Sequence, residues 1–169
     1  MHGSKLPCMQ KVNVNDMEPL TWSSPKGKFG GEGIQVSEAL GRKPNSTDLL
    51  ERHPFDVEIM SVLPGTLPYP YHSHSAQWEF YHVISGKGSV RHDGGETEIG
   101  PGDAFIFKPG EAHQLINTGS DKLVVYVVAD NPIGESWHYP DSGKIGVRLP
   151  KRRLFRENDG HDDYYEGEE

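Results

Sequence analysis

The chain has 169 residues, the size of one ordinary domain, so a single core is expected. It contains 20 Gly and 13 Pro, and only 34% of its residues are hydrophobic, which excludes long amphipathic helices and coiled coils and favours a turn-rich β architecture. The formal net charge of −8 would repel a phosphate backbone, so nucleic-acid binding is disfavoured.

The sequence also predicts where the protein resides. Its longest apolar run, residues 123–129, is short compared with the roughly 20 residues that a transmembrane helix needs, so no membrane span is expected. The N-terminal residues lack the apolar stretch of a secretory signal. The single cysteine, Cys8, cannot form an internal disulfide. These features together predict a cytoplasmic protein.

Residues 1–52 mix polar, Gly and Pro positions with little periodicity. This pattern predicts an N-terminal arm that packs on the rest of the protein and contributes an edge strand near residues 33–36. Because arms and exposed sheet edges of this kind are often covered by a second subunit, we expect a homodimer.

Residues 53–132 form the predicted barrel, where short β-like runs alternate with turn signals. Asp93-Gly94-Gly95 suits a tight hairpin, and the Gly- and Pro-rich turns that follow would interrupt any helix. A series of short strands at this spacing predicts a β-sandwich or barrel. The runs are residues 55–63, 78–85, 88–92, 96–99, 104–107, 112–117 and 123–129.

Beyond residue 132 the strand pattern weakens. Residues 133–156 are predicted to be a C-terminal extension, and residues 157–169 an acidic tail that is disordered or pairs with the basic residues before it. Those basic residues could instead receive an anionic substrate, so both interpretations stay open. They include Lys144, Arg148, Arg152 and Arg153.

Four residues stand out as candidate metal ligands: His72, His74, Glu79 and His113. In an extended strand, residues two apart point to the same face, so His72 and His74 can reach one cation. Glu79 needs a turn or bulge after His74 to return to that side, and then shares a face with Tyr81. Three imidazoles and one carboxylate suit a divalent first-row metal ion and leave positions open for water or substrate.

Glycines and prolines flank these residues at regular spacing: Gly65 and Gly86 around His72, His74 and Glu79, then Gly102, Pro109 and Gly110 before His113, with Asn117 after it. The pattern resembles the two sequence motifs of the cupin superfamily. Two details depart from those motifs, namely six residues between Gly65 and His72 and Lys108 at a position where proline is common.

The resemblance implies an all-β, single-domain cupin jelly roll, a double-stranded β-helix barrel, with a metal ion inside. By the same resemblance His72, His74, Glu79 and His113 would be the ligands of one Fe, Mn, Zn, Ni or Co ion. More faintly, residues 137–144 are similar to small cupins loosely described as sugar-phosphate-isomerase-like. The implied partner is a small-molecule substrate or ligand.

Three functional hypotheses follow. The first is an isomerase or epimerase of a sugar or sugar phosphate, in which the metal holds adjacent oxygens and Tyr81 or Glu79 transfers protons. The second is an Fe(II)-dependent dioxygenase. The third is a metal-containing ligand-binding or sensor module without catalysis, so the sequence leaves open whether the protein is an enzyme.

Overall fold

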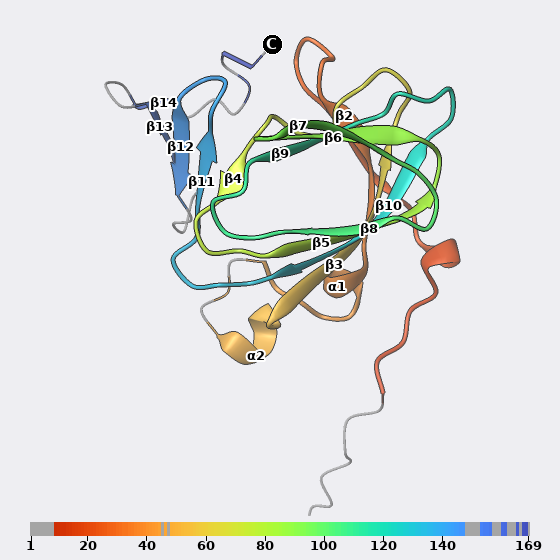
Figure 1. Ribbon diagram of the computed structural model, residues 1–169. Helices are drawn as coiled ribbons and strands as arrows, with labels where there is room; N and C mark the ends of the chain where they lie inside the picture. The colour runs from red at the N-terminus through yellow and green to blue at the C-terminus, as the bar shows by residue number, and fades with distance from the viewer. Residues whose placement is uncertain are drawn as a thin grey trace, which may run out of the picture.

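The computed structural model describes residues 9–44, 46, 48–147, 153–156, 160–161, 165, 167 and 168. These residues form mostly antiparallel β structure, arranged as a barrel with an additional sheet along one side (Figure 1). The fold class predicted from the sequence is therefore confirmed. The helices are short: a 3-10 turn η1 (Val14–Asp16), α1 (Val36–Ala39) and α2 (Leu49–Arg52).

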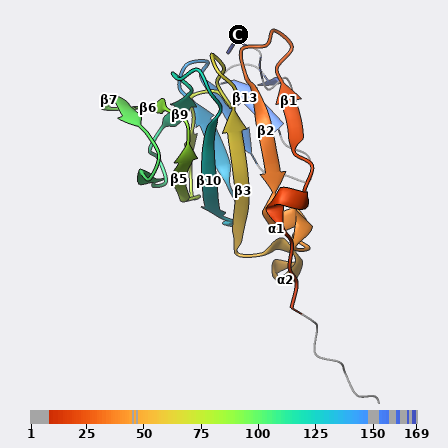
Figure 2. The same ribbon diagram turned by 90° about the vertical axis from the view of Figure 1, so that its right-hand side faces the viewer.

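The largest sheet, here called the main sheet, has the strand order β1-β2-β3-β10-β5-β8, and all its pairings are antiparallel. Five of these strands can be followed side by side in Figure 2, where β10 runs between β3 and β5. Their bounds are β1 (Leu20–Ser23), β2 (Gly30–Gln35), β3 (Phe55–Val62), β5 (Glu79–Ser85), β8 (Ala104–Phe107) and β10 (Leu123–Asp130).

A three-stranded sheet, the small sheet, faces the main sheet across the barrel interior (Figure 1). It has the order β7-β6-β9, with β6 (Gly88–His92), β7 (Gly95–Ile99) and β9 (His113–Ile116). The hairpin between β6 and β7 turns at the predicted Asp93-Gly94-Gly95 sequence. All seven runs identified in the sequence are strands, each with bounds within two residues of those expected.

Alternating residues of the barrel strands point inward and form one apolar core. Leu123 and Val125 of β10 are fully buried, while their neighbours on the outer face are partly exposed. The buried core consists of Met60, Val62, Tyr81, Val83, Val90, Ile99, Leu115, Leu123, Val125 and Val127.

The C-terminal region forms a sheet that the sequence analysis did not predict, here called the C-terminal sheet. Its order is β14-β13-β12-β11-β4, so the two-residue strand β4 (Ser73–His74) joins it from the barrel side (Figure 1). The Gly- and Pro-interrupted sequence concealed these short strands. The others are β11 (Ser136–Tyr139), β12 (Lys144–Val147), β13 (Arg153–Arg156) and β14 (Gly160–His161).

The predicted arm and tail are partly described. Strands β1 and β2 pair with each other, and β2 with β3, so the N-terminal region extends the main sheet. In the tail, the buried Glu168 carboxylate lies 3.5 Å from the Nζ atom of the buried Lys144. Most of the predicted disordered tail, like Arg148 and Arg152, lies outside the described residues.

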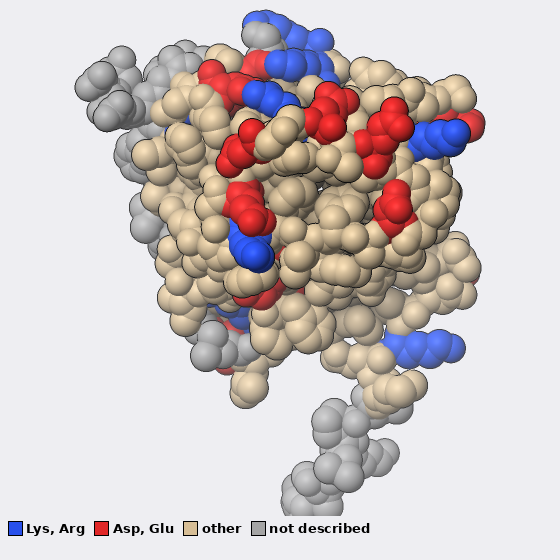
Figure 3. All heavy atoms as spheres, in the orientation of Figure 1, with Lys and Arg blue, Asp and Glu red and all other residues tan. Residues whose placement is uncertain are grey.

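Within the described residues, no helix is long and apolar enough to cross a membrane. Many of the charged side chains on the face shown in Figure 3 are carboxylates, in keeping with the acidic composition.

Candidate metal centre

The candidate ligands come from strands of all three sheets or, for His72, from the residue just before β4. His74 belongs to β4 of the C-terminal sheet, Glu79 begins β5 of the main sheet, and His113 begins β9 of the small sheet. Backbone hydrogen bonds in both directions join His72 to His113, with N to O distances of 3.2 and 2.8 Å. The antiparallel bridge fixes the two imidazoles beside each other, as the sequence motifs imply.

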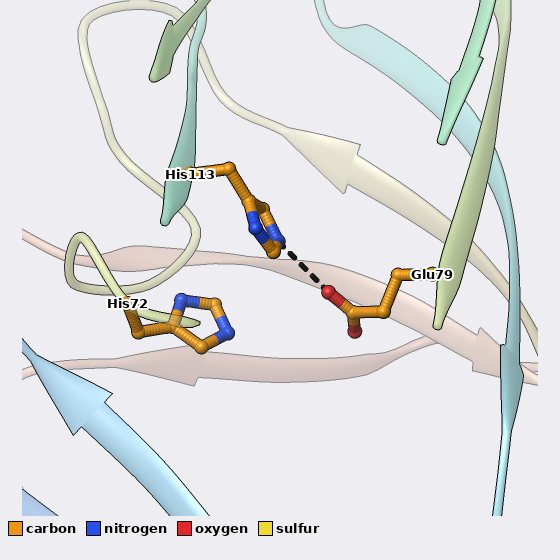
Figure 4. A group of neighbouring side chains, drawn as sticks. All are labelled: His72, Glu79 and His113. Atoms are coloured by element: carbon orange, nitrogen blue, oxygen red, sulfur yellow. Dashed lines mark ion pairs between the residues drawn. The ribbon is translucent and has the colours of Figure 1, made fainter. Parts of the chain in front are cut away.

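The ligand atoms converge on one point inside the barrel. His72, Glu79 and His113 each offer an atom within 4.8 Å of the others, a group that could hold a metal ion (Figure 4). The Nε2 atom of His113 lies 2.8 Å from Glu79 Oε2. His74 lies at the edge of this group, with its Nε2 3.1 Å from His72 Nε2 and 3.5 Å from Glu79 Oε2.

Each imidazole is held by an oxygen on its Nδ1 side. The His72 Nδ1 atom lies 2.9 Å from the Pro70 carbonyl, and the His113 Nδ1 atom lies 3.2 Å from the Glu111 carbonyl. The His74 Nδ1 atom faces the Glu135 carboxylate at 3.5 Å. Because a carbonyl oxygen can only accept a hydrogen bond, the Pro70 and Glu111 carbonyls fix the proton of His72 and His113 on Nδ1 and leave their Nε2 lone pairs available to a metal ion.

Ring packing restrains the histidines further. The His113 ring stacks on Phe107 with 4.0 Å between centroids and 1° between planes. The His74 ring meets Trp137 of β11 edge-on. The ligands are thus held in place by apolar contacts and hydrogen bonds, as metal sites generally require.

Electrostatics in the cluster favours a neutral His72 and an ionised Glu79. Burial, together with His113 and His74, lowers the pKa of His72 to about 3. Burial alone would raise the pKa of Glu79, but the surrounding histidines outweigh it and leave that pKa well below its ordinary value. These are the protonation states in which His and Glu bind metal ions.

The donor set fits a divalent metal ion. The Nε2 lone pairs of His72 and His113 and the Glu79 carboxylate repel one another at these distances unless a cation lies between them. In addition, His113 Nε2 is buried and makes no hydrogen bond of normal geometry among the described residues, although Glu79 Oε2 lies 2.8 Å away. Mixed nitrogen and oxygen ligands suit first-row transition metals, so the chemistry of the set agrees with the sequence prediction.

A cavity of ≈ 250 Å³ opens beside these residues. The hydroxyl of Tyr81 lies 3.2 Å from Glu79 Oε2, and the hydroxyl of Tyr69 lies 3.2 Å from that of Tyr81. Burial raises the pKa of Tyr81, and the Glu79 carboxylate adds to this rise. The cavity lining is Trp22, Glu58, Met60, Tyr69, His72, His74, Glu79, Tyr81 and Val127.

Other sequence candidates lie around the site or away from it. His82 is exposed on the outer face of β5, as its position opposite Glu79 predicts. Gln114 donates a hydrogen bond to the Tyr69 carbonyl at 2.8 Å and so anchors the segment before His72. Gln77 donates to the Asp130 carbonyl and ties the start of β5 to the end of β10.

Two carboxyl groups near the site were missed by the sequence analysis. Glu58 lies on the inner face of β3, where its spacing from Met60 and Val62 was an available signal. Glu135 precedes β11 and is fully buried beside His74, where Ser75 donates a backbone hydrogen bond to it at 2.9 Å. No local sequence pattern marks Glu135, because its contact depends on the C-terminal sheet.

Comparisons with known proteins agree with this architecture. An oxalate-binding protein of Thermotoga maritima is 33% identical over 97 residues, which cover 56% of this chain and 74% of the relative. A solved structure from Silicibacter pomeroyi, described as a sugar phosphate isomerase from a cupin superfamily, has a TM-score of 0.73 and 22% identity over 88% of this chain and 94% of its own.

A structure from Thermotoga maritima, described as a predicted oxalate decarboxylase, has a TM-score of 0.57 and 21% identity over 73% of this chain and 100% of its own. At these identities the two structures show the shared fold. The family model described as a cupin domain matches residues 58–129, the part of the chain that supplies all the candidate ligands. With the relative, the motifs and the barrel in agreement, the chain belongs to the cupin superfamily.

Proposed function

We propose that the protein is a metal-dependent cupin that isomerises or epimerises a small oxygen-rich molecule, a sugar or sugar phosphate, inside its barrel. The observation that carries this proposal is the cavity of ≈ 250 Å³ in which candidate metal ligands stand beside hydroxyl and carboxyl groups able to exchange protons. That volume suits a small metabolite, since sites for drug-sized ligands range from about 300 to 1,000 Å³.

The proposed ligands are His72, His74, Glu79 and His113. When bound, a divalent metal ion would act as a Lewis acid that polarises two adjacent oxygens of the substrate. The Tyr81 hydroxyl, which donates to Glu79 Oε2 in this structure, keeps its proton at neutral pH and would turn to donate that hydrogen bond to the substrate oxygen that gains charge. Glu79 and Tyr81 are the catalytic residues proposed from the sequence, and their 3.2 Å contact joins the metal ligands to the cavity.

Binding of a small dicarboxylate without turnover is a second candidate. It is favoured by the relative named as an oxalate-binding protein. Oxalate, like a sugar, presents two adjacent oxygens that one metal ion can hold. Neutral tyrosine hydroxyls beside the ligands could donate to the outer oxygens of such an anion.

Metal analysis tests the shared basis of both candidates. We expect about one divalent metal ion per chain in protein purified without chelator, and loss of most of that metal in His113→Ala, because a single lost ligand opens a four-ligand site. His82→Ala is the matched control, since His82 is an exposed imidazole on the outer face. Equal occupancy in all three proteins, or no metal after reconstitution, would contradict the proposed site.

Substrate screening with the metal-loaded protein separates the candidates. Turnover of sugars or sugar phosphates that is indifferent to oxygen supports the isomerase. Oxalate that raises the melting temperature without being consumed supports the binding protein. Oxygen uptake that depends on iron would favour the dioxygenase hypothesis instead.

We also propose that the protein forms a homodimer through the outer face of the main sheet. Large apolar side chains stand on this face, including Phe80, Ile84 and Ile106, which are 37%, 47% and 49% exposed. An antiparallel sheet with one solvated face normally carries polar residues there. A second copy would cover this face through an isologous contact, in which both subunits contribute the same strands.

A further inference from the structure

Glu58 is a carboxyl group on the inner face of the barrel. It lies on β3 two residues before Met60 and four before Val62, both of which belong to the apolar core. A carboxyl group at such a position is unfavourable unless it is compensated or has a use, because burial removes the water that stabilises its charge. Its surroundings therefore indicate what it does.

The backbone makes room for this carboxyl group. A Cβ atom at Gly33, on the neighbouring strand β2, would lie only 2.2 Å from Glu58 Oε1, so a side chain at residue 33 would displace the carboxyl group. Gln35, on the same strand, hydrogen-bonds the Glu58 side chain. The space beside β2 is thus filled by the Glu58 carboxyl group, which one neutral amide holds.

Glu58 lines two cavities. One is the metal cavity, which it shares with His72, His74 and Glu79. The other, of ≈ 120 Å³, is lined by Arg42, Asp56 and again by Glu58 and Glu79. Glu58 therefore stands between the candidate ligands and a second polar space, from which a proton could be supplied.

No cation neutralises Glu58 within the described part of the chain. The nearby Arg42 is engaged by Glu38 and Asp56, the latter at 3.2 Å. Burial raises the pKa of Glu58 to about 7, and Asp56 adds to this rise more than Glu38 or Glu79. The charged and titratable groups around Glu58 are Glu38, Arg42, Asp56, Tyr69, His72, His74, Glu79 and Tyr81.

We propose that Glu58 carries the exchangeable proton of the metal cavity and is the acid and base that acts on the bound molecule. This inference rests on the proposed function for its substrate, a 2-hydroxy carbonyl compound. It divides the chemistry between three groups: Glu79 binds the metal, Tyr81 donates a hydrogen bond, and Glu58 moves the proton.

The proton transfers balance as follows. Ionised Glu58 removes the proton from the carbon that bears the hydroxyl group, the C–H electron pair forms a C=C bond, and the carbonyl pair moves onto the carbonyl oxygen. Neutral Glu58 then returns the proton to the former carbonyl carbon. The hydroxyl proton moves to the former carbonyl oxygen, and the oxygen that loses this proton becomes the new carbonyl oxygen. Glu58 ends ionised, as it began.

The test compares the zinc-loaded wild type with Glu58→Gln and with Glu98→Gln, a control that removes an exposed glutamate on β7. Carbon-13 NMR follows the carboxyl carbons of labelled glutamate from about pH 5 to pH 9. We expect one carboxyl group to titrate near neutral pH in the wild type and in Glu98→Gln, and to be missing from Glu58→Gln. If no glutamate titrates in that range, or if the signal persists in Glu58→Gln, the inference is wrong.

Two further readouts define the role of Glu58. Zinc affinity should stay within about twofold of wild type in Glu58→Gln, because this residue is not among the proposed ligands; a large loss would make Glu58 a ligand and overturn the inference. Oxalate then serves as a non-reacting probe. Calorimetry near pH 7 in two buffers of different ionisation enthalpy should show proton uptake on oxalate binding in wild type but not in Glu58→Gln.

Failure of the proposed function would look different. Absent metal, or absent turnover with every sugar tested, would count against the isomerase while the NMR titration still decides whether Glu58 holds the proton. Uptake of the same number of protons by both proteins would overturn the role of Glu58 while leaving the metal site intact.

Discussion

At the level of single residues, Glu135 holds His74 on the side opposite the candidate metal. Its carboxylate is fully buried, lies 3.5 Å from the His74 Nδ1 atom, and accepts the Ser75 backbone hydrogen bond. Carboxylates in this position fix the tautomer and orientation of a histidine ligand and make it a stronger donor.

We predict that Glu135→Gln weakens zinc binding by about 10-fold to 100-fold, because the amide keeps the shape of the carboxylate but loses its charge. Competition with a chromogenic chelator measures the dissociation constant. Glu98→Gln, which removes an exposed carboxylate, should bind zinc like the wild type. An unchanged constant in Glu135→Gln would show that Glu135 only fills space.

The raised pKa of Glu58 also affects stability. Between pH 4.5, which is the ordinary pKa of the group, and about pH 7, the folded protein binds more protons at Glu58 than the unfolded chain does. Glu58 therefore destabilises the fold as pH rises through that range. We predict that Glu58→Gln becomes more stable relative to wild type over the same range, by on the order of 3 kcal/mol. Urea unfolding at several pH values measures this; a difference independent of pH would contradict it.

At the scale of elements, the turn after β5 depends on Gly86. This glycine has a φ of 84°, and a Cβ there would lie 2.3 Å from the carbonyl oxygen of Lys122, the residue before β10. Gly102 has a similar φ of 94° but open space around it. Substitution of either glycine would strain the backbone, but only at Gly86 would the new Cβ atom also clash.

We predict that Gly102→Ala lowers the free energy of unfolding by about 1 kcal/mol, and that Gly86→Ala lowers it by a further 1–3 kcal/mol, roughly the cost of overpacking. Chemical denaturation of both variants checks this. Equal losses would mean that β5 and β10 separate easily at this turn.

The barrel strands were predictable because they are short runs bounded by clear turn signals, as at Asp93-Gly94-Gly95, where the chain turns between β6 and β7. The C-terminal sheet was not, because its strands are short, Gly-interrupted and stabilised by pairing with residues distant in sequence. The residues of the site likewise divide into predictable and unpredictable ones. His72, His74, Glu79 and His113 sit in recognisable motifs, whereas Glu135 is brought to His74 only by the pairing of β11 with β4.

At the scale of the whole molecule, the outer face of the main sheet should determine the oligomeric state. Phe80 of β5 is directly paired with Ile106 of β8 on this face. In a two-fold symmetric dimer, a charge placed there would be buried in both subunits, next to its symmetry copy.

We predict that the wild type sediments as a dimer at micromolar concentration and that Phe80→Glu shifts it to the monomer. Ile133→Glu is the control, because Ile133 is 75% exposed in the segment after β10 and does not belong to the sheet face. A monomeric wild type, or a Phe80→Glu variant that remains dimeric, would place the interface elsewhere or remove it.

Strands β4, β5 and β9 bring the candidate ligands His74, Glu79 and His113 together from three separate sheets. An ion held there would act as a cross-link between distant parts of the chain, closing loops that otherwise depend on weaker contacts. The supply of the metal ion would then govern the lifetime of each protein molecule. Chains made during metal shortage would open more often and be degraded sooner, so their abundance would follow the metal content of the cell.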